Sequence, residues 1–398
     1  MRILKVVQAY YPFQEMGGPV VKVRALARGL AQRDHSVTVL TVDLGLAGRE
    51  FPGLTFKQGE WGWRSEEDGV TAVYLPTLLR FRAITINPRV IRFSRGLGAR
   101  FDVVHVYGLY DLLGPAIGSS CRNQGVAYVI EPMGMFRPIV RSIWLKRLYH
   151  RTLGKRFIRG ARFLVATSEQ ERQELLQSGI GPERIVVRRN GVDGPGKMPE
   201  RGELRRRLSI PVQARMVLFL GRLVSKKSPD LLIEAFADWR ERSMRASDSV
   251  LVLAGPDEAD GYAARLRARA KELGLGESVR FVGPLYDEAK WQAYRDADVF
   301  VLPSQNENFG NTAAEAAVCG TPVIVTDVCG IASFVKRAGR VVSHSRKELA
   351  GALTEMLDDP DLRQRYSSGC EEMAGALSWN GPVAEAEKLY EACVNGAA

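Results

Sequence analysis

The sequence predicts an α/β protein with two doubly wound domains, and three features carry this prediction. An apolar run at 2–9 leads through a glycine-containing loop into a segment with helical periodicity and then into a second apolar run at 36–42. This order of strand, loop, helix and strand opens a Rossmann-like unit. The same order starts afresh at 216–220, after the Gly/Pro linker at 194–199. A chain of 398 residues is long enough for two such domains.

The first domain is expected over residues 1–193. Its first helix is placed at 19–32, where apolar residues follow the helical period. The glycine-rich segment 44–70 is expected to be a mobile loop. Its Trp61 and Trp63 either present their faces to a ligand or anchor the loop to the core. Further strands are expected at 71–75, 103–107, 127–130, 161–168 and 184–189, with helices at 88–100 and 110–124.

The second domain is expected over residues 200–378. After a buried strand at 298–302, a polar loop leads into an alanine-rich helix at 313–318, which Asn311 or Thr312 can cap. Gly320 and Pro322 follow that helix and end it. The other strands are expected at 216–220, 250–254 and 279–282, and the other helices at 229–242, 260–273, 346–358 and 360–376.

Composition bounds the classes of function. A net charge of +11 either serves solubility alone or indicates an anionic partner, which can be an anionic ligand, nucleic acid or an anionic membrane. The five cysteines and four histidines are scattered, so no metal site is expected, and a reducing cytosol fits the cysteine usage. The first apolar run is too short for a signal peptide, and no stretch reaches the ~18–20 apolar residues of a membrane span. We therefore expect a cytoplasmic protein.

Two basic runs lie in the first half of the chain. Residues 137–162 hold nine Lys or Arg and no acid, with apolar residues interleaved at roughly helical spacing. Such runs form either a solvated helix face or a surface drawn to anionic lipid. Nucleic acid is not expected as a partner, because no known binding motif accompanies the charge. The second run holds Arg80, Arg82, Arg89, Arg92, Arg95 and Arg100.

The stretch 303–326, PSQNENFGNTAAEAAVCGTPVIVT, combines groups that suit a ligand with hydroxyls and phosphates. Glu307 precedes the expected helix and Glu315 lies within it, so two carboxylates can accept from hydroxyl groups. The backbone N–H groups around 309–312 can donate to a phosphate at the helix start. Gly17 and Gly18, at the first loop–helix junction, would likewise let the backbone approach a phosphate closely.

Three segments carry a resemblance to a known family. NENFGNTAAEAAVCGTPVI, with its E-x7-E pair, GRLVSKKSPDLLIEAF and GGPVVKVRALARGLAQRDHSVTVLT resemble retaining GT-B glycosyltransferases of the family 4 type, the glycosyl transferases group 1. The segments span both expected domains, so the resemblance covers most of the chain. It implies two facing Rossmann-like domains with the active site in the interdomain cleft, and a last helix, at 380–396, that packs back on the first domain.

The resemblance also implies roles for particular residues. Arg222 and Lys227 would hold the diphosphate of a sugar nucleotide and stabilise the charge that gathers on the β-phosphate as the anomeric bond breaks. Glu307, the third expected catalytic residue, would lie near the donor sugar, and Glu315 would accept from the ribose hydroxyls. No metal and no cofactor are then required. The expected donor-binding residues are Gly17, Gly18, Asn308, Phe309, Gly310, Asn311, Glu315, Gly255 and Leu285.

The acceptor side departs from the family pattern. Many relatives carry His at the positions of Met133 and Tyr107, and methionine cannot hydrogen-bond as imidazole does. Glu131, Met133, Arg137 and Tyr107 are the acceptor-site candidates. His105 is expected to be a buried structural residue.

The function implied is transfer of a hexose, with retention of configuration, from a UDP- or GDP-linked donor to a glycan or lipid-linked acceptor in surface polysaccharide biosynthesis. The enzyme would be cytoplasmic, with a possible peripheral contact to an anionic membrane. Two alternatives stay open at this point: a sugar-nucleotide 2-epimerase of the same fold, which needs no acceptor, and a non-enzymatic basic binding protein.

Overall fold

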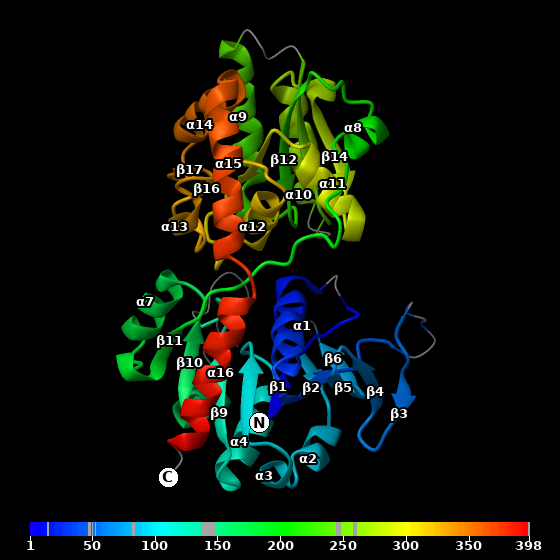
Figure 1. Ribbon diagram of the computed structural model, residues 1–398, viewed down its shortest axis with the longest axis vertical. Helices are drawn as coiled ribbons and strands as arrows, with labels where there is room; N and C mark the ends of the chain where they lie inside the picture. Colours follow the sequence, from blue (N-terminus) through cyan, green and yellow to red (C-terminus); the bar gives the residue numbers. More distant parts are fainter. Residues whose placement is uncertain are drawn as a thin grey trace. The chain divides into compact units, whose positions relative to one another are not determined.

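The computed structural model describes residues 1–13, 16–46, 49, 51, 53–81, 84–136, 148–243, 248–257 and 261–396. The chain forms two compact units. Unit 1 combines Met1–Gly191 with Trp379–Ala398, and unit 2 is Val192–Ser378. Each unit is an α/β domain with a largely parallel sheet (Figure 1).

The sheet of unit 1 has the strand order β11-β10-β9-β8-β1-β2-β5-β4-β3. It is parallel from β11 to β5, whereas β4 and β3 pair antiparallel. The direction of the strand order reverses between β1 and β8, which pair directly. The strands are β1 (Arg2–Val6), β2 (Ser36–Val42), β3 (Lys57–Gln58), β4 (Trp63–Glu67), β5 (Val70–Leu75), β8 (Val103–Tyr107), β9 (Ala127–Glu131), β10 (Phe163–Ala166) and β11 (Ile185–Val187); β6 (Leu79–Phe81) pairs separately with β7 (Ile84–Ile86).

The helices of unit 1 include the last helix of the chain. α1 (Gly18–Ala31) buries Val23 and Leu26 on one face, as the helical period predicts. α16 (Asn380–Asn395) packs against α1 and the strands β8 and β9 (Figure 1). It buries Leu389 and Tyr390 in the same core as the apolar face of α1. The remaining helices are α2 (Arg89–Phe93), α3 (Leu97–Arg100), α4 (Leu113–Asn123), a π-helix (His150–Gly154), α6 (Lys155–Gly160), α7 (Glu169–Gln177) and a 3₁₀ turn (Pro182–Arg184).

Unit 2 has a fully parallel sheet with the strand order β14-β13-β12-β15-β16-β17. Both faces are covered, because successive residues of β12 enter different cores: Leu218 packs in one and Phe219 in the other. The strands are β12 (Arg215–Leu220), β13 (Ser249–Ala254), β14 (Val279–Gly283), β15 (Val299–Leu302), β16 (Val323–Thr326) and β17 (Gly339–Val342). The helices are α8 (Glu203–Arg207), α9 (Pro229–Arg242), α10 (Tyr262–Glu272), α11 (Asp287–Asp296), α12 (Asn311–Val318), α13 (Ala332–Val335), α14 (Arg346–Asp358) and α15 (Pro360–Ala376), with 3₁₀ turns at Ser225–Lys227 and Gly276–Ser278.

Two expectations about unit 1 were wrong. The segment 44–70 is not wholly irregular, because β3 and β4 extend the sheet next to β5. Trp61 anchors this segment: its ring lies 5.0 Å from that of Phe93, edge to face. The single helix expected over 88–100 is two short helices, since Gly96 adopts a left-handed conformation between them, at φ 69°.

Candidate functional site

The two strongest sequence motifs meet at the point where the strand order of unit 2 reverses. The loop 221–228 follows β12 and the loop 303–310 follows β15, and these two strands are neighbours in the sheet. Ligands of doubly wound domains bind at the carboxyl ends of the strands at such a point. The backbone N–H of Gln305 donates to the carbonyl of Lys226 at 2.9 Å, so the two loops are in contact.

Lys227 and Glu307 form an ion pair across these loops. Only 14% and 16% of their side chains are exposed, so the pair is shielded from most of the solvent. Lys226 lies beside it, and burial is the main cause of the lowered pKa of its ammonium group. The carboxylate of Glu307 opposes this shift, whereas the positive charges of Lys227 and Arg222 lower the pKa further. Arg222 belongs to the same loop, 221–228, as both lysines. Three cations and one carboxylate thus gather at this strand edge, an arrangement suited to a polyanionic ligand.

A glycine permits the close approach of the loops after β12 and β13. A Cβ atom on Gly255 would lie 1.8 Å from the carbonyl oxygen of Gly221, a distance that no side chain could tolerate. The N–H of Gly255 donates to the carbonyl of Gly283 at 2.8 Å, which joins the end of β14 to the same edge. Leu285 follows and packs, partly buried, against the core of unit 2.

The start of α12 differs from the expected cap. Gly310 is the N-cap residue, at φ 108°, and no described side chain caps the helix, so neither Asn311 nor Thr312 has the expected role. A left-handed N-cap favours glycine, and the first N–H groups of the helix have no intrahelical partners. Phe309 is buried and its carbonyl accepts from the N–H of Ile331 at 2.7 Å, which fixes the loop beside the helix start. These features leave the helix start able to bind an anion.

Glu315, on α12, is held by two residues of α11 that the sequence analysis did not identify. Lys290 donates to one carboxylate oxygen at 2.9 Å, and the Tyr294 hydroxyl donates to the other at 2.8 Å. Tyr294 is fully buried, and both burial and the adjacent carboxylate raise the pKa of its hydroxyl group. Lys290 and Tyr294 are four residues apart and therefore lie on one face of α11, but only the fold shows that this face meets α12. The hydroxyl of Thr312, which was expected as a possible helix cap, is instead buried and has no hydrogen-bond partner among the described residues.

In unit 1 the expected phosphate-facing glycines lie at the start of α1. Gly17 is the N-cap residue, at φ 88°, and Gly18 is the first helical residue. A Cβ atom on Gly17 would meet no atom of the described chain within 4 Å, so backbone conformation rather than space explains a glycine there. This helix start follows β1, at the point where the strand order of unit 1 reverses.

Two acceptor-site candidates are too deeply buried to meet a ligand directly. Glu131 is fully buried and forms ion pairs with Lys22 and Arg188. Burial alone would raise the pKa of Glu131, but Arg188 and Lys22 outweigh it and hold the pKa below its usual value. Tyr107, also buried, accepts from the ammonium group of Lys5 at 2.7 Å. We therefore withdraw Glu131 and Tyr107 as groups that contact an acceptor.

The same buried network contains His105, which is fully buried as expected. Its Nδ1 lies 2.7 Å from the hydroxyl oxygen of Tyr390, so it links β8 to α16. Burial, followed by the charge of Lys5, lowers the pKa of His105 well below its ordinary value. Met133 is only partly buried and has a left-handed backbone, at φ 56°, so it stays a candidate. Arg137 lies outside the described residues.

Comparison with known proteins places the chain among sugar transferases. A family model described as "Glycosyl transferases group 1" matches residues 200–373, and a "Glycosyl transferase 4-like domain" matches residues 17–191. A D-inositol 3-phosphate glycosyltransferase of Thermobispora bispora is 34% identical over 399 residues, covering 94% of this chain and 90% of the relative. A protein of the same name from Thermomonospora curvata is 35% identical, and that match spans 58% of this chain and 57% of the relative.

Solved structures share the fold over the whole chain. HepE of Anabaena in complex with UDP superimposes with a TM-score of 0.74 at 18% identity, covering 99% of this chain and all of that one. Sucrose-phosphate synthase of Thermosynechococcus elongatus gives a TM-score of 0.72 at 21% identity, with 99% of each chain covered. At these identities the likeness concerns the fold alone.

Proposed function

Because the chain belongs to the group 1 glycosyl transferases, enzymes of the GT-B fold that use a nucleotide sugar, we propose that it transfers a hexose from a UDP- or GDP-linked donor with retention of anomeric configuration. The observation that carries the proposal is the cation cluster at the strand edge of unit 2. There Lys227 pairs with Glu307, and Arg222 and Lys226 lie close by. This cluster is the site for the donor diphosphate.

The chemistry follows from where charge develops. Breaking the anomeric C–O bond leaves negative charge on the β-phosphate, and fixed cations in a shielded site stabilise that charge more than they stabilise the ground state. Arg222 supplies a planar fork of donors and Lys227 a point charge. These cations do the work that a metal ion does in other phosphate sites, so transfer is expected to proceed without one. In the retaining route, the leaving phosphate takes the proton of the acceptor hydroxyl.

The carboxylates bind the neutral parts of the donor. Glu307 is held by Lys227 and accepts from the hydroxyls of the hexose, beside the start of α12. Glu315 accepts from the ribose hydroxyls, with Lys290 and Tyr294 fixing its orientation. Each carboxylate oxygen can accept more than one hydrogen bond, so a ribose diol can bind while both partners remain in place. Asn308, Asn311 and the N–H groups from Phe309 to Thr312 complete the donor site, and the base lies near Gly255 and Leu285.

Two classes of acceptor are candidates. The basic runs, which suit an anionic lipid surface, favour a glycan or lipid-linked acceptor in surface polysaccharide biosynthesis, with Met133 and Arg137 on the acceptor side. The name of the relatives, D-inositol 3-phosphate glycosyltransferase, favours a phosphorylated polyol instead. We assign the binding site of the acceptor, whichever of the two classes it belongs to, to unit 1.

A thermal-shift panel of nucleotide sugars, followed by product analysis, tests the proposal. A true donor stabilises the folded chain by mass action, so one base and one sugar are expected to raise Tm above the others. The donor is then incubated with each acceptor class, and the anomeric configuration of the product is read by NMR. Conversion of the donor alone into an epimer would replace transfer with the epimerase alternative. An inverted product would contradict the retaining route.

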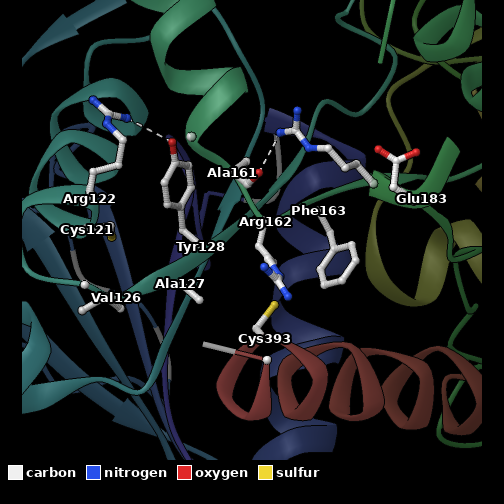
Figure 2. A pocket seen from close by; sticks show the side chains of 14 residues that line it. Cys121, Arg122, Val126, Ala127, Tyr128, Ala161, Arg162, Phe163, Glu183 and Cys393 are labelled. Carbon is white, nitrogen blue, oxygen red and sulfur yellow. Dashed lines mark hydrogen bonds between the residues drawn. The ribbon is translucent and has the colours of Figure 1, made fainter. Parts of the chain in front are cut away.

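A basic surface of unit 1 supports a peripheral membrane contact. A shallow hollow of about 640 Å³ is lined by Arg122, Arg151, Lys155, Arg156 and Arg159, and the described residues that line it include no acid. A second hollow of about 720 Å³ shares Arg122 and adds Arg162 and Arg184, with Glu183 as its described acid (Figure 2). Leu153, 46% exposed, lies on the adjoining π-helix, and Leu148, 51% exposed, lies just before that helix. Exposed leucines among cations suit an anionic lipid surface.

Co-sedimentation with vesicles tests this contact. The full chain is expected to bind vesicles that contain phosphatidylglycerol and to lose that binding as salt is raised, whereas neutral vesicles do not bind it. The variant Arg151→Gln/Arg156→Gln is expected to weaken binding, and Arg337→Gln/Arg340→Gln, on an exposed surface of unit 2, serves as the control for net charge. Equal binding to neutral and anionic vesicles would contradict the proposal. In the part of the chain that the structure describes, no helix is both long and apolar enough to cross a bilayer.

A further inference from the structure

A cation-rich hollow of unit 2 lies at the end of the sheet opposite to the donor loops. Its volume is about 530 Å³, and its lining includes Arg215, Asp298 and Pro322. These residues stand at the amino ends of β12, β15 and β16. The loops 221–228 and 303–310 leave the carboxyl ends of β12 and β15. Because the strands are parallel, the two ends lie on opposite edges, so this hollow is separate from the proposed donor site.

Asp298 is the focus of the positive charges in this hollow. Its side chain is 8% exposed, and its Oδ2 accepts from Arg205 at 2.8 Å. Its Oδ1 lies 3.5 Å from a nitrogen of Arg201 and 3.9 Å from nitrogens of both Arg215 and Arg363. Distances of 3.9 Å are too long for hydrogen bonds, so Asp298 attracts Arg215 and Arg363 only by charge. Arg363 also donates through Nη1 to the backbone carbonyl of Met356 at 2.9 Å, a neutral partner that leaves the positive charge of its guanidinium group in place.

Two further arginines at the hollow, Arg205 and Arg295, differ in how many of their N–H groups have hydrogen-bond partners. Arg205 is buried and gives its donors to Asp298 and to the backbone carbonyls of Pro211, Ala214 and Asp296, so its role is structural. Arg295 donates through Nη1 to the carbonyl of Cys319 at 3.1 Å, whereas its Nε is buried without a partner among the described residues.

The charge balance therefore favours an anion. Besides Arg205, four arginines line the hollow, and Asp298 is the one carboxylate among the described lining residues. Asp296, on α11, does not line the hollow, and its carboxylate oxygens accept hydrogen bonds from the backbone N–H groups of Gly202 and Arg205 at the start of α8. Guanidinium groups that converge on one oxygen repel one another unless further negative charge joins them.

We propose that this hollow binds a phosphate dianion through Arg201, Arg215, Arg295 and Arg363. Guanidinium forks match the oxygens of a phosphate better than any other side chain does. The phosphate is supplied either by a free inorganic anion, phosphate or pyrophosphate, or by a small sugar phosphate, and a hollow of about 530 Å³ has room for either. The proposal concerns binding alone and stands whether or not the proposed transfer reaction is correct.

Isothermal titration of the full chain with inorganic phosphate, pyrophosphate and glucose 6-phosphate, at constant ionic strength set with sodium chloride, tests the proposal. The test variant is Arg201→Gln/Arg215→Gln, because Arg201 is 58% exposed and Arg215 makes only the 3.9 Å contact with Asp298 among the described ion pairs. The control Arg337→Gln/Arg340→Gln removes the same charge from an exposed surface of the same unit. A third variant, Lys227→Met, shows whether the anion binds at the donor loops instead, because binding there would be lost when this charge is removed.

We expect saturable binding that the test variant weakens about tenfold or more, since each charged hydrogen bond contributes roughly a factor of ten. The control and Lys227→Met are expected to retain it. Tighter binding of glucose 6-phosphate than of phosphate, with no binding of glucose, would identify a sugar phosphate as the ligand; equal binding would identify the free anion. No saturable binding in the wild type, or binding lost in Lys227→Met but kept in the test variant, would overturn the proposal.

Discussion

Lys227→Met is the substitution that tests the proposed chemistry most sharply. It keeps the apolar stem of the side chain and removes the charge that faces Glu307. In the proposed reaction this charge stabilises the departing β-phosphate. Loss of one preorganised donor to a developing anion lowers kcat by about 10²–10³, or about 2.7–4 kcal/mol in activation free energy.

The effect on stability is expected to be much smaller. The lost pair leaves Glu307 without its cation, but the carboxylate is 16% exposed and can recruit water, so the free energy of unfolding falls by about 1–3 kcal/mol. The chain therefore stays folded at assay temperature, and its circular dichroism spectrum and a cooperative thermal transition check this. A loss of activity by unfolding can thus be told from a loss of chemistry.

The assay is the initial rate of nucleoside diphosphate release with the donor identified in the thermal-shift panel. Lys336→Met, at an exposed position of unit 2, is the matched control and is expected to retain wild-type kcat. Lys227→Arg keeps the charge and should recover part of the rate. A folded Lys227→Met variant with kcat within threefold of the wild type would refute the role given to this cation.

Three further outcomes are expected. Tyr294→Phe removes the hydroxyl that donates to Glu315 and should raise the KM for the donor about tenfold with little change in kcat, whereas Tyr366→Phe should change neither. Gly255→Ala should lower the free energy of unfolding in urea by about 1–3 kcal/mol or more, because its Cβ would meet the carbonyl oxygen of Gly221, whereas Gly351→Ala, where a Cβ meets no described atom within 4 Å, should be neutral or stabilising. Glu131→Gln should destabilise unit 1 by about 3–5 kcal/mol at pH 7, because Lys22 and Arg188 stay buried without their carboxylate. The pKa of Glu131 is lower in the folded state, so the stability that its carboxylate contributes is present above the ordinary pKa of 4.5 and is lost as pH falls through the folded-state pKa. The difference in the free energy of unfolding between wild type and variant, measured in urea, should therefore shrink on acidification. A difference that stays constant with pH would contradict this reasoning.

The fold could be predicted from sequence because local patterns mark most of its elements. The buried parallel strands are continuous apolar runs, and β12 (Arg215–Leu220), which is apolar from Met216 onward, is a clear case. β4 was missed because its residues, WRSEE, are mostly polar and show little apolar alternation. Its place in the sheet comes from pairing with β5, which sequence patterns do not report. The break between α2 and α3 needed the left-handed backbone of Gly96, a feature that a lone glycine in a helical pattern only suggests.

The candidate site divides in the same way. The motif glycines and the loops around Lys227 and Glu307 are local in sequence, and their resemblance to a family supplied the roles that spacing alone could not. The partners of Glu315 and Glu131 could not be predicted, because they come from other elements of the fold. Lys22 and Arg188 lie 109 and 57 residues from Glu131. Lys22 is on α1 and Arg188 follows β11, so only the packing of the helix and the sheet brings them to the end of β9. A strand-end carboxylate thus looked like a ligand contact when it is a buried structural group.

The affinity of the full chain for UDP and GDP, compared with that for UMP and GMP, tests the central claim most directly. If Arg222 and Lys227 hold the diphosphate, the wild type will bind one nucleoside diphosphate at least tenfold more tightly than its monophosphate, and Arg222→Ala/Lys227→Met will lose that preference. An equal preference for the diphosphate in wild type and variant would show that these cations do not bind the donor phosphates.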